Sequence, residues 1–285
     1  MSIHKNVHYI FDRETIALPR FDTLVIGGGG FKGCLFLGGL AYLEELDALT
    51  SVRTYCGTSV GAIVCLLSVM GYTARQQLEM LPISNVYKFQ KQAPYLINAV
   101  PDAIREIVDE TKTFQQLFDE SGKHLFVVAF DMTASREKIF SVLTSPDVSV
   151  AQALIYSCAL PSLNMPCDEQ GHRFIDGGVV NNLPVDIADR FDLSEHILTL
   201  NIGMSDQEQQ TRTVINDLMN AMVSVPSSLL DEYRLASCRK PVHLMTFKCD
   251  RGLEQLISVT ETNKRDMFAM GYNTARDEIK KFHVK

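Results

Sequence analysis

Short apolar runs alternate with longer amphipathic stretches along the chain. Runs rich in Val, Ile, Leu and Phe that end at glycine or at a polar residue predict strands at 23–26, 52–56, 124–132, 173–176, 196–203 and 241–247. Stretches with apolar residues at helical spacing predict helices at 31–49, 60–71, 74–81, 149–160, 184–191, 206–236 and 262–282, with two more beginning at Pro101 and after Thr113. A run at 138–143 is expected to pair with 124–132 as a hairpin.

Strands that alternate with helices indicate an α/β protein with helices on both faces of a sheet. We therefore expect a three-layer α/β/α fold around a central, largely parallel sheet. The chain shows no internal repeat and no Pro- or Gly-rich linker, so we expect residues 1–285 to form a single domain.

Composition and charge narrow the class of partner. The 285 residues are 46% hydrophobic and 21% charged, and the net charge of −7 argues against a nucleic-acid partner. The longest apolar run, 62–67, is far shorter than the roughly 20 residues of a transmembrane helix, and no secretory signal precedes it. Seven scattered cysteines without a CxxC pair indicate neither a disulfide framework nor a zinc site. We expect an intracellular, cytoplasmic protein.

The glycine-rich stretch GGGGFKG at 27–33 follows the first predicted strand and opens a helix. A P-loop requires G-x-x-x-x-G-K-[ST], but here Lys32 precedes Gly33 and no hydroxyl follows. Gly28, Gly30 and Gly33 do fit the G-x-G-x-x-G fingerprint of dinucleotide-binding proteins, although no acidic residue ends the next strand to hold the ribose. A third interpretation is an oxyanion hole, in which free backbone N–H groups stabilise a developing negative charge.

An oxyanion hole requires a nucleophile nearby, and the next strand ends in one. Gly57-Thr58-Ser59-Val60-Gly61 is a G-x-S-x-G motif between a predicted strand and a buried helix, which is the setting of a nucleophile elbow. Adjacent parallel strands would bring this turn beside the glycine loop at the carboxyl edge of the sheet. Ser59 is therefore the candidate nucleophile.

Serine needs a neighbouring base to take its proton. His196, His243 and His283 follow the elbow in sequence, but none stands in a recognisable turn, and the first two are expected to be structural. Asp176 is the better candidate, because it ends a predicted strand and is followed by Gly177 and Gly178, which allow a tight turn. We expect a Ser59–Asp176 dyad in which the surroundings raise the basicity of the carboxylate.

Three motifs now stand together: GGGFKG at 28–33, GTSVG at 57–61 and DGG at 176–178. Their order and spacing resemble the patatin-like phospholipase family, with motifs G-G-G-x-[KR]-G, G-x-S-x-G and D-G-[GA]. The resemblance extends over about residues 22–205, including SCALPSLNMP at 157–166, and leaves 206–285 unplaced within the same expected domain. It implies an acyl hydrolase that uses a Ser–Asp dyad and an acyl-enzyme without metal or cofactor.

The resemblance also assigns roles by position. It implies Ser59 as nucleophile, Asp176 as base, and backbone N–H groups of the glycine loop as the oxyanion hole. We take Gly28, Gly29 and Gly30, together with Val60 after the nucleophile, as the candidate donors. The supporting motif positions are Lys32, Gly33, Gly57, Gly61, Gly177 and Gly178.

The expected substrate is a lipid ester, met at a membrane or lipid-droplet surface by a protein peripheral to it. The aromatic and basic segment 84–100 is a candidate lid or membrane contact, although a buried loop explains its composition equally well. Asp131, Asn181 and Asn182 are expected to shape turns rather than touch substrate. Two alternatives stay open: a catalytically silent lipid-binding or scaffold protein, and a dinucleotide-binding protein.

Overall fold

The computed structural model describes residues 19–81, 93–159, 166–203, 225–248 and 260–281. Seven strands within these residues form one sheet in the order β4-β3-β2-β1-β6-β7, with β5 paired to β3 outside that path. The strands are β1 (Thr23–Ile26), β2 (Thr54–Thr58), β3 (His124–Asp131), β4 (Arg136–Phe140), β5 (Phe174–Asp176), β6 (Ile197–Gly203) and β7 (Val242–Lys248).

The centre of the sheet is parallel. Strands β3, β2, β1, β6 and β7 run in one direction, whereas β4 and β5 both pair antiparallel with β3. Ile26 at the end of β1 pairs with Gly57 near the end of β2. The glycine loop and the Ser59 turn therefore leave the sheet side by side at its carboxyl edge, where α/β proteins place their sites.

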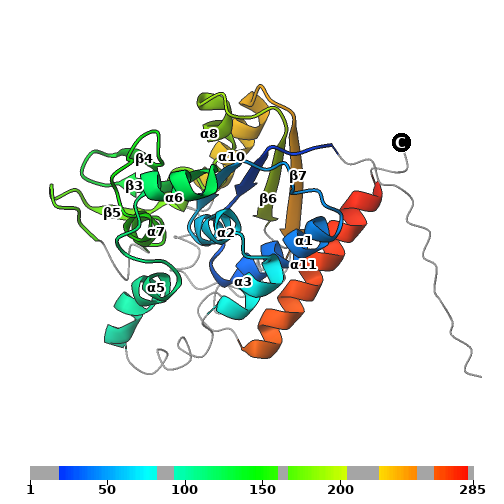
Figure 1. Ribbon diagram of the computed structural model, residues 1–285, viewed down its shortest axis with the longest axis horizontal. Helices are drawn as coiled ribbons and strands as arrows, with labels where there is room; N and C mark the ends of the chain where they lie inside the picture. Colours follow the sequence, from blue (N-terminus) through cyan, green and yellow to red (C-terminus); the bar gives the residue numbers. More distant parts are fainter. Residues whose placement is uncertain (1–18, 82–92, 160–165, 204–224, 249–259, 282–285) are drawn as a thin grey trace, which may run out of the picture.

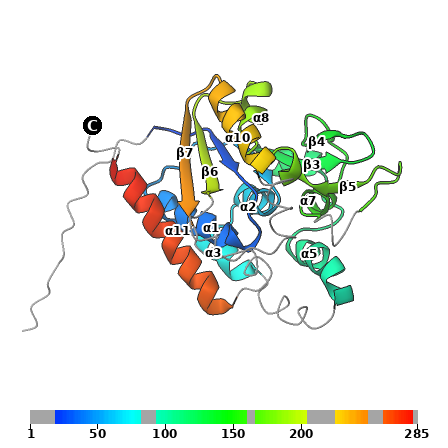
Figure 2. The same cartoon turned by 180° about the vertical axis from the view of Figure 1, so that it is seen from behind.

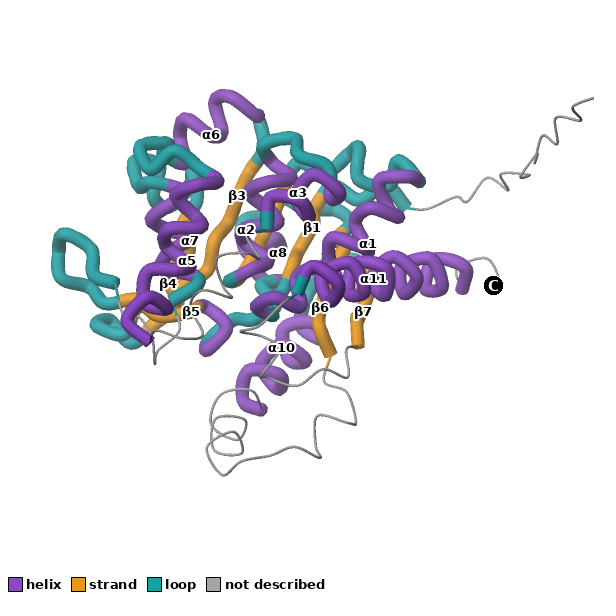
Figure 3. Tube along the Cα trace, turned by 90° about the horizontal axis from the view of Figure 1, so that it is seen from below, coloured by secondary structure: helices purple, strands orange, loops and turns teal. Residues whose placement is uncertain are grey.

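Most helices cover one face of the sheet (Figure 1). The helices on this side are α1 (Gly33–Glu45), α2 (Val60–Val69), α3 (Ala74–Met80), α5 (Ala93–Ile107), α6 (Phe114–Ser121), α7 (Val150–Ser157) and α11 (Glu261–Lys281). Helix α11 lies along α1, as Figure 3 shows, and α5, α6 and α7 gather near β3. Leu24, Ile26, Leu125 and Val127 point into the core beneath these helices.

The other face carries a smaller core under α8 (Val185–Arg190) and α10 (Val225–Ser237), seen from behind in Figure 2. Val25, Cys56, Phe126 and Val128 pack there, each next in sequence to a residue of the larger core. This alternation follows from the two-residue period of a strand that is buried on both faces. The expected three-layer fold with a largely parallel central sheet is confirmed.

Most predicted elements form, with corrections at their ends. The helix expected at 31–49 begins as a 3-10 turn, Gly30–Lys32, and α1 ends at Glu45 because Asp47 reverses the chain with a φ of 55°. The expectation that Pro101 opens a helix is wrong, since Pro101 lies inside α5. Proline there removes one helical hydrogen bond without ending the helix.

Other boundaries follow local chemistry. Thr73 and Thr113 each form a capping box at the start of a helix. The hairpin of β3 and β4 is confirmed, with β4 two residues earlier than the expected run at 138–143. The helix expected at 206–236 is only partly described. Residues 206–224 lie outside the described residues, and α10 (Val225–Ser237) covers the remainder.

Candidate active site

Ser59 stands in the turn between β2 and α2, alone between the last strand residue and the first helical one. Its backbone has φ 55° and ψ −129°. This left-handed region is unfavourable for a residue with a side chain and is often found at functional sites. The Ser59 N–H donates a hydrogen bond to Oγ of Ser157, 2.8 Å away at the end of α7. The strand, strained turn and helix of a nucleophile elbow are all present.

The two motif glycines of this turn are needed for close packing. A Cβ on Gly57 would lie 2.5 Å from the backbone N of Ala62. A Cβ on Gly61 would lie 2.5 Å from the carbonyl oxygen of Gly27, at the start of the glycine loop. Only glycine lets α2 begin this close to the end of β1, which explains the G-x-S-x-G spacing in physical terms.

Asp176 reaches Ser59 by way of β3. It is the last residue of β5, where it pairs with Ala129 of β3, and β3 in turn pairs with β2. The side chain of Ser59 lies close enough to Asp176 to limit the rise that burial causes in the pKa of its carboxyl. Oδ1 of Asp176 also accepts a hydrogen bond from the Gly178 N–H at 2.7 Å. The structure thus brings together the two residues that the sequence proposed as a dyad.

The surroundings make Asp176 more basic than an ordinary aspartate. Burial raises its pKa from 3.8 to about 6, although the Ser59 side chain and the hydrogen bond from Gly178 stabilise the charged form and limit the rise. At neutral pH the carboxylate is still ionised and can accept a proton. A pKa closer to neutrality makes it a better general base than a solvent-exposed aspartate.

The glycine loop lies directly against the elbow. A Cβ on Gly28 would lie 3.4 Å from Cβ of Ser59, and one on Gly33 would lie 2.6 Å from Cγ2 of Val60. The Gly28 N–H, however, donates to the carbonyl oxygen of Asn182 at 3.1 Å. The expectation that Gly28 supplies an oxyanion donor therefore needs correction, because its N–H is already engaged.

Three other N–H groups remain as candidate donors. Within the described residues, no carbonyl accepts from the N–H of Gly29 or Gly30. The N–H of Val60 is the first of α2, a position without an intrahelical acceptor. Gly30 has a φ of 56°, which suits glycine and sets the direction of its N–H.

The remaining motif positions and their neighbours make structural contacts around the site. Lys32 closes the 3-10 turn before α1, and the structure assigns it no chemistry. Gly177 is buried against the carbonyl of Val128 in β3. Oγ1 of Thr58, the residue before the nucleophile, donates to the Asn181 carbonyl at 2.8 Å. The elbow and the turn after Asp176 are thereby joined.

Several neighbours of the dyad were not found from the sequence. Ser157 holds the elbow backbone, and the Cys158 thiol lies near the Ser59 side chain. Burial raises the pKa of Cys158 well above its usual range, so the thiol stays neutral. Asn182 contributes its carbonyl to the Gly28 N–H, which goes beyond the turn role expected of it. Ser157 and Cys158 open the stretch SCALPSLNMP noted above, but they are distant from Ser59 in sequence and no local pattern predicted their contacts with it.

The other predicted polar residues have structural contacts. Asn181 donates to Glu137 and Asp186 at 2.7 and 2.9 Å. Asp131 accepts from the Ala134 N–H at 2.9 Å, as expected of a turn residue, and also binds Nδ1 of His172 at 2.6 Å. His243 packs edge-on against Phe21, at the amino end of its strand. His283 and residues 84–92 lie outside the described residues, so the lid interpretation of 84–100 stays a prediction.

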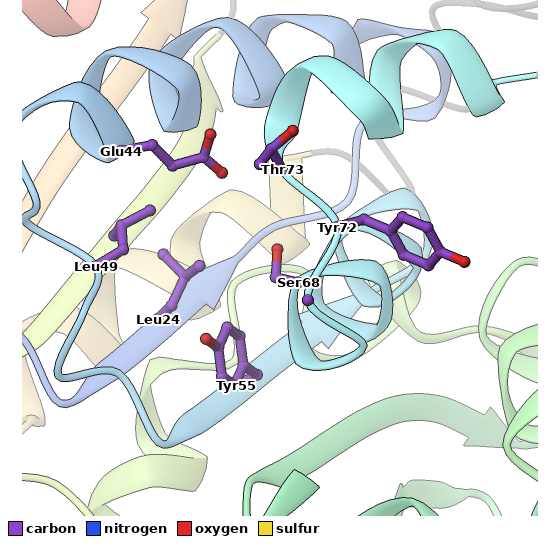
Figure 4. A pocket seen from close by; sticks show the side chains of 8 residues that line it. Leu24, Glu44, Leu49, Tyr55, Ser68, Tyr72 and Thr73 are labelled. Atoms are coloured by element: carbon purple, nitrogen blue, oxygen red, sulfur yellow. The ribbon is translucent and has the colours of Figure 1, made fainter.

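A hollow of about 230 Å³ lies at the opposite end of the strands (Figure 4). It is lined by Leu24 and Tyr55 near the starts of β1 and β2, and by Glu44 of α1. The Glu44 carboxylate accepts from the Ala74 N–H at 2.9 Å and so holds the start of α3. This hollow is separate from Ser59. Of the described helices, none has the length and apolar character needed to cross a membrane.

An α/β sheet with a G-x-S-x-G elbow beside a glycine loop is an arrangement found in serine hydrolases. The sequence matches the family model for patatin-like phospholipases over residues 24–189, more than half of the 285 residues. The chain belongs to the patatin-like phospholipase family.

Individual relatives agree with this placement. "Probable lipid hydrolase 463L" of Invertebrate iridescent virus 6 is 29% identical over 188 residues, which cover 60% of this chain and 64% of the relative. "Triacylglycerol lipase 4" of Saccharomyces cerevisiae is 25% identical over 228 residues, which cover 64% of this chain but 24% of that protein. The chain therefore spans less than two thirds of the length of both.

A solved structure supports the fold. The crystal structure of VipD from Legionella pneumophila superimposes with a TM-score of 0.56 at 17% identity, covering 92% of this chain and 67% of that one. At this identity the similarity concerns the fold alone.

Proposed function

We propose that the protein is a lipid acyl hydrolase that cleaves carboxylic ester bonds through an acyl-enzyme on Ser59. The observation that carries this proposal is the close pair of side chains formed by Ser59 at the strained elbow and Asp176, whose pKa is raised by burial and lowered in part by the serine. It lies beside a glycine loop whose Gly29 and Gly30 N–H groups have no acceptor among the described residues. Membership of the patatin-like phospholipase family supports a lipid substrate.

In the first half of the reaction, Oγ of Ser59 attacks the acyl carbonyl carbon and its proton passes to Asp176. The carbonyl oxygen becomes an oxyanion, which the N–H groups of Gly29, Gly30 and Val60 stabilise. The tetrahedral intermediate then collapses and the ester bond breaks. The leaving alcohol takes the proton from Asp176, and the acyl group stays on Ser59.

In the second half, Asp176 removes a proton from water, which attacks the acyl-enzyme. The second tetrahedral intermediate releases the fatty acid, and Ser59 recovers its proton from Asp176. The pKa of Asp176, about 6, suits both transfers, because the carboxylate is ionised at neutral pH yet basic enough to accept a proton. Each step conserves charge and needs no further cofactor.

The proposed substrates are phospholipids, lysophospholipids or acylglycerols, acted on at a membrane or lipid-droplet surface. Two of the relatives, named as a probable lipid hydrolase and a triacylglycerol lipase, support this range. Mass spectrometry of products released from mixed lipids would identify the headgroup and acyl position. Wild type should release fatty acid, and Ser59→Ala should release none.

Covalent labelling tests the nucleophile directly. An organophosphonate ester probe should label wild type at Ser59, and Ser59→Ala should not be labelled. Full labelling of Ser59→Ala would exclude Ser59 as the nucleophile. Tight lipid binding without release of fatty acid or labelling would favour the alternative, a catalytically silent lipid-binding protein.

A further inference from the structure

Helix α10 turns polar side chains toward the protein and apolar ones toward solvent. Ser227 and Asp231, one turn apart, are 6% and 7% exposed. On the outer side, Leu229 is 60% and Tyr233 is 70% exposed. Buried polar groups destabilise a protein unless they are hydrogen-bonded, so the side chains on this inner face must have hydrogen-bond partners.

Each inner residue binds the backbone of one short segment, 178–183. Oγ of Ser227 donates to the Gly178 carbonyl at 2.8 Å. Oδ1 of Asp231 accepts from the Leu183 N–H at 3.1 Å. Nη2 of Arg234 donates to the Val180 carbonyl at 2.8 Å. The spacing of four and three residues places all three side chains on one side of the helix.

The segment held in this way connects both halves of the candidate site. The Gly178 N–H donates to Asp176, and the Gly178 carbonyl accepts from Ser227. Farther along, the Asp231 carboxyl lies near the Asn182 side chain, which limits the rise that burial causes in the pKa of that carboxyl. The Asn182 carbonyl accepts the Gly28 N–H at 3.1 Å.

We propose that α10 is a positioning element for the reaction, in which Ser227 fixes Gly178 and thereby the orientation of the Asp176 carboxylate. This inference rests on the proposed function, because it assigns a role relative to the Ser59–Asp176 dyad. Ser227 and Asp231 lie beyond residue 189, where the family match ends. The proposed role thus lies in the part of the chain after residue 189, which the family match does not cover.

The chain offers a matched pair of serines for the test. Ser227 is buried, whereas Ser228 on the same helix is exposed. Ser227→Ala should lower kcat for a soluble p-nitrophenyl butyrate substrate about tenfold, with KM within about twofold. Organophosphonate labelling should slow by a similar factor. Ser228→Ala should behave as wild type, and Ser227→Thr, which retains the hydroxyl, should recover most of the rate.

Hydrogen exchange provides a readout that does not depend on activity. In Ser227→Ala, peptides spanning 174–183 should exchange faster, while those of α1 and α11 should not change. Ser228→Ala should leave both regions unchanged. The proposal is overturned if peptides 174–183 exchange as slowly in Ser227→Ala as in wild type, or if kcat does not change. A wild type that is neither labelled nor active refutes the proposed function, and the exchange comparison then still decides whether α10 holds the segment.

Discussion

At the scale of single residues, Asp176 combines a raised pKa of about 6 with a nearby Ser59 side chain and a hydrogen bond from Gly178. Because folding raises this pKa from 3.8, ionisation of Asp176 opposes folding. That unfavourable contribution is complete above about pH 6 and disappears as the pH falls through 3.8. In the proposed mechanism this group acts as the base at neutral pH, where its ionisation reduces stability.

The same pKa predicts the pH dependence of turnover. A general base works only when ionised, so kcat/KM should rise with pH through about 6 and level off above it. An ordinary aspartate would place this limb near 3.8. A pH profile measured with a soluble ester tests the prediction.

Asp231 is the control for that profile, since burial also raises its pKa to about 6. In Asp231→Asn the rise of the pH profile through about 6 should persist, although kcat should be lower than in wild type. Disappearance of the limb in this variant would assign it to Asp231 and contradict the prediction.

A second prediction concerns the backbone of Gly30. Its φ of 56° disfavours any other residue, so Gly30→Ala should lower the free energy of unfolding by about 1–2 kcal/mol. Rotation out of this region relieves the strain and changes the direction of the N–H, so kcat should also fall if this N–H is an oxyanion donor. Gly122→Ala is the matched control, because Gly122 has φ 64° with nothing within 4 Å of an added Cβ. The control should lose similar stability and keep its kcat, and equal kcat values in both variants would exclude an oxyanion role for Gly30.

At the scale of elements, the elbow depends on α7. Ser157→Ala leaves the Ser59 N–H without its acceptor and should lower the free energy of unfolding by about 1–3 kcal/mol. The labelling rate of Ser59 should fall as well, because the turn loses one restraint. Urea unfolding and labelling kinetics measure the two effects.

Ser121→Ala is a suitable comparison for the Ser157 variant. Its hydroxyl donates to the Leu117 carbonyl and accepts from the Lys123 N–H at 3.1 Å, so it also serves a backbone N–H but lies away from the elbow. A loss of stability as large in Ser121→Ala as in Ser157→Ala would show that the elbow contact has no special weight.

Local patterns predicted the elements and motifs but only some of the contacts between them. Apolar runs marked the central strands, and glycine spacing marked the loop and the elbow, because these signals arise within a few residues. The pairing of β5 with β3 depends on a strand of three residues and could not be predicted. The engagement of the Gly28 N–H by Asn182 joins residues far apart in sequence, and so the sequence wrongly counted Gly28 among the free donors.

At the scale of the whole molecule, α11 packs closely on α1 through two glycines. A Cβ on Gly38 would lie 2.6 Å from the backbone N of Tyr272, and one on Gly271 would meet the Leu35 carbonyl. Strands β6 and β7 extend the same sheet beyond the family match. These contacts favour the hypothesis that residues 1–285 fold as a single domain.

Gly271→Ala tests this hypothesis. Alanine normally stabilises an exposed helix by about 0.5–1 kcal/mol relative to glycine, but here it should destabilise the protein because its Cβ meets backbone. One unfolding transition, shifted to lower temperature in calorimetry, is the expected result. Asn273→Ala, at an exposed position of the same helix, should not lower it. Two separate transitions would contradict the single-domain hypothesis.

The strained backbone of Ser59 also has an evolutionary consequence. At φ 55° and ψ −129°, glycine fits better than any residue with a side chain, so selection for stability alone favours replacing the nucleophile. A descendant of this chain freed from the need for chemistry would be expected to drift toward glycine at this position. If the proposed function holds, serine should therefore be retained at this position only in lineages that use its hydroxyl.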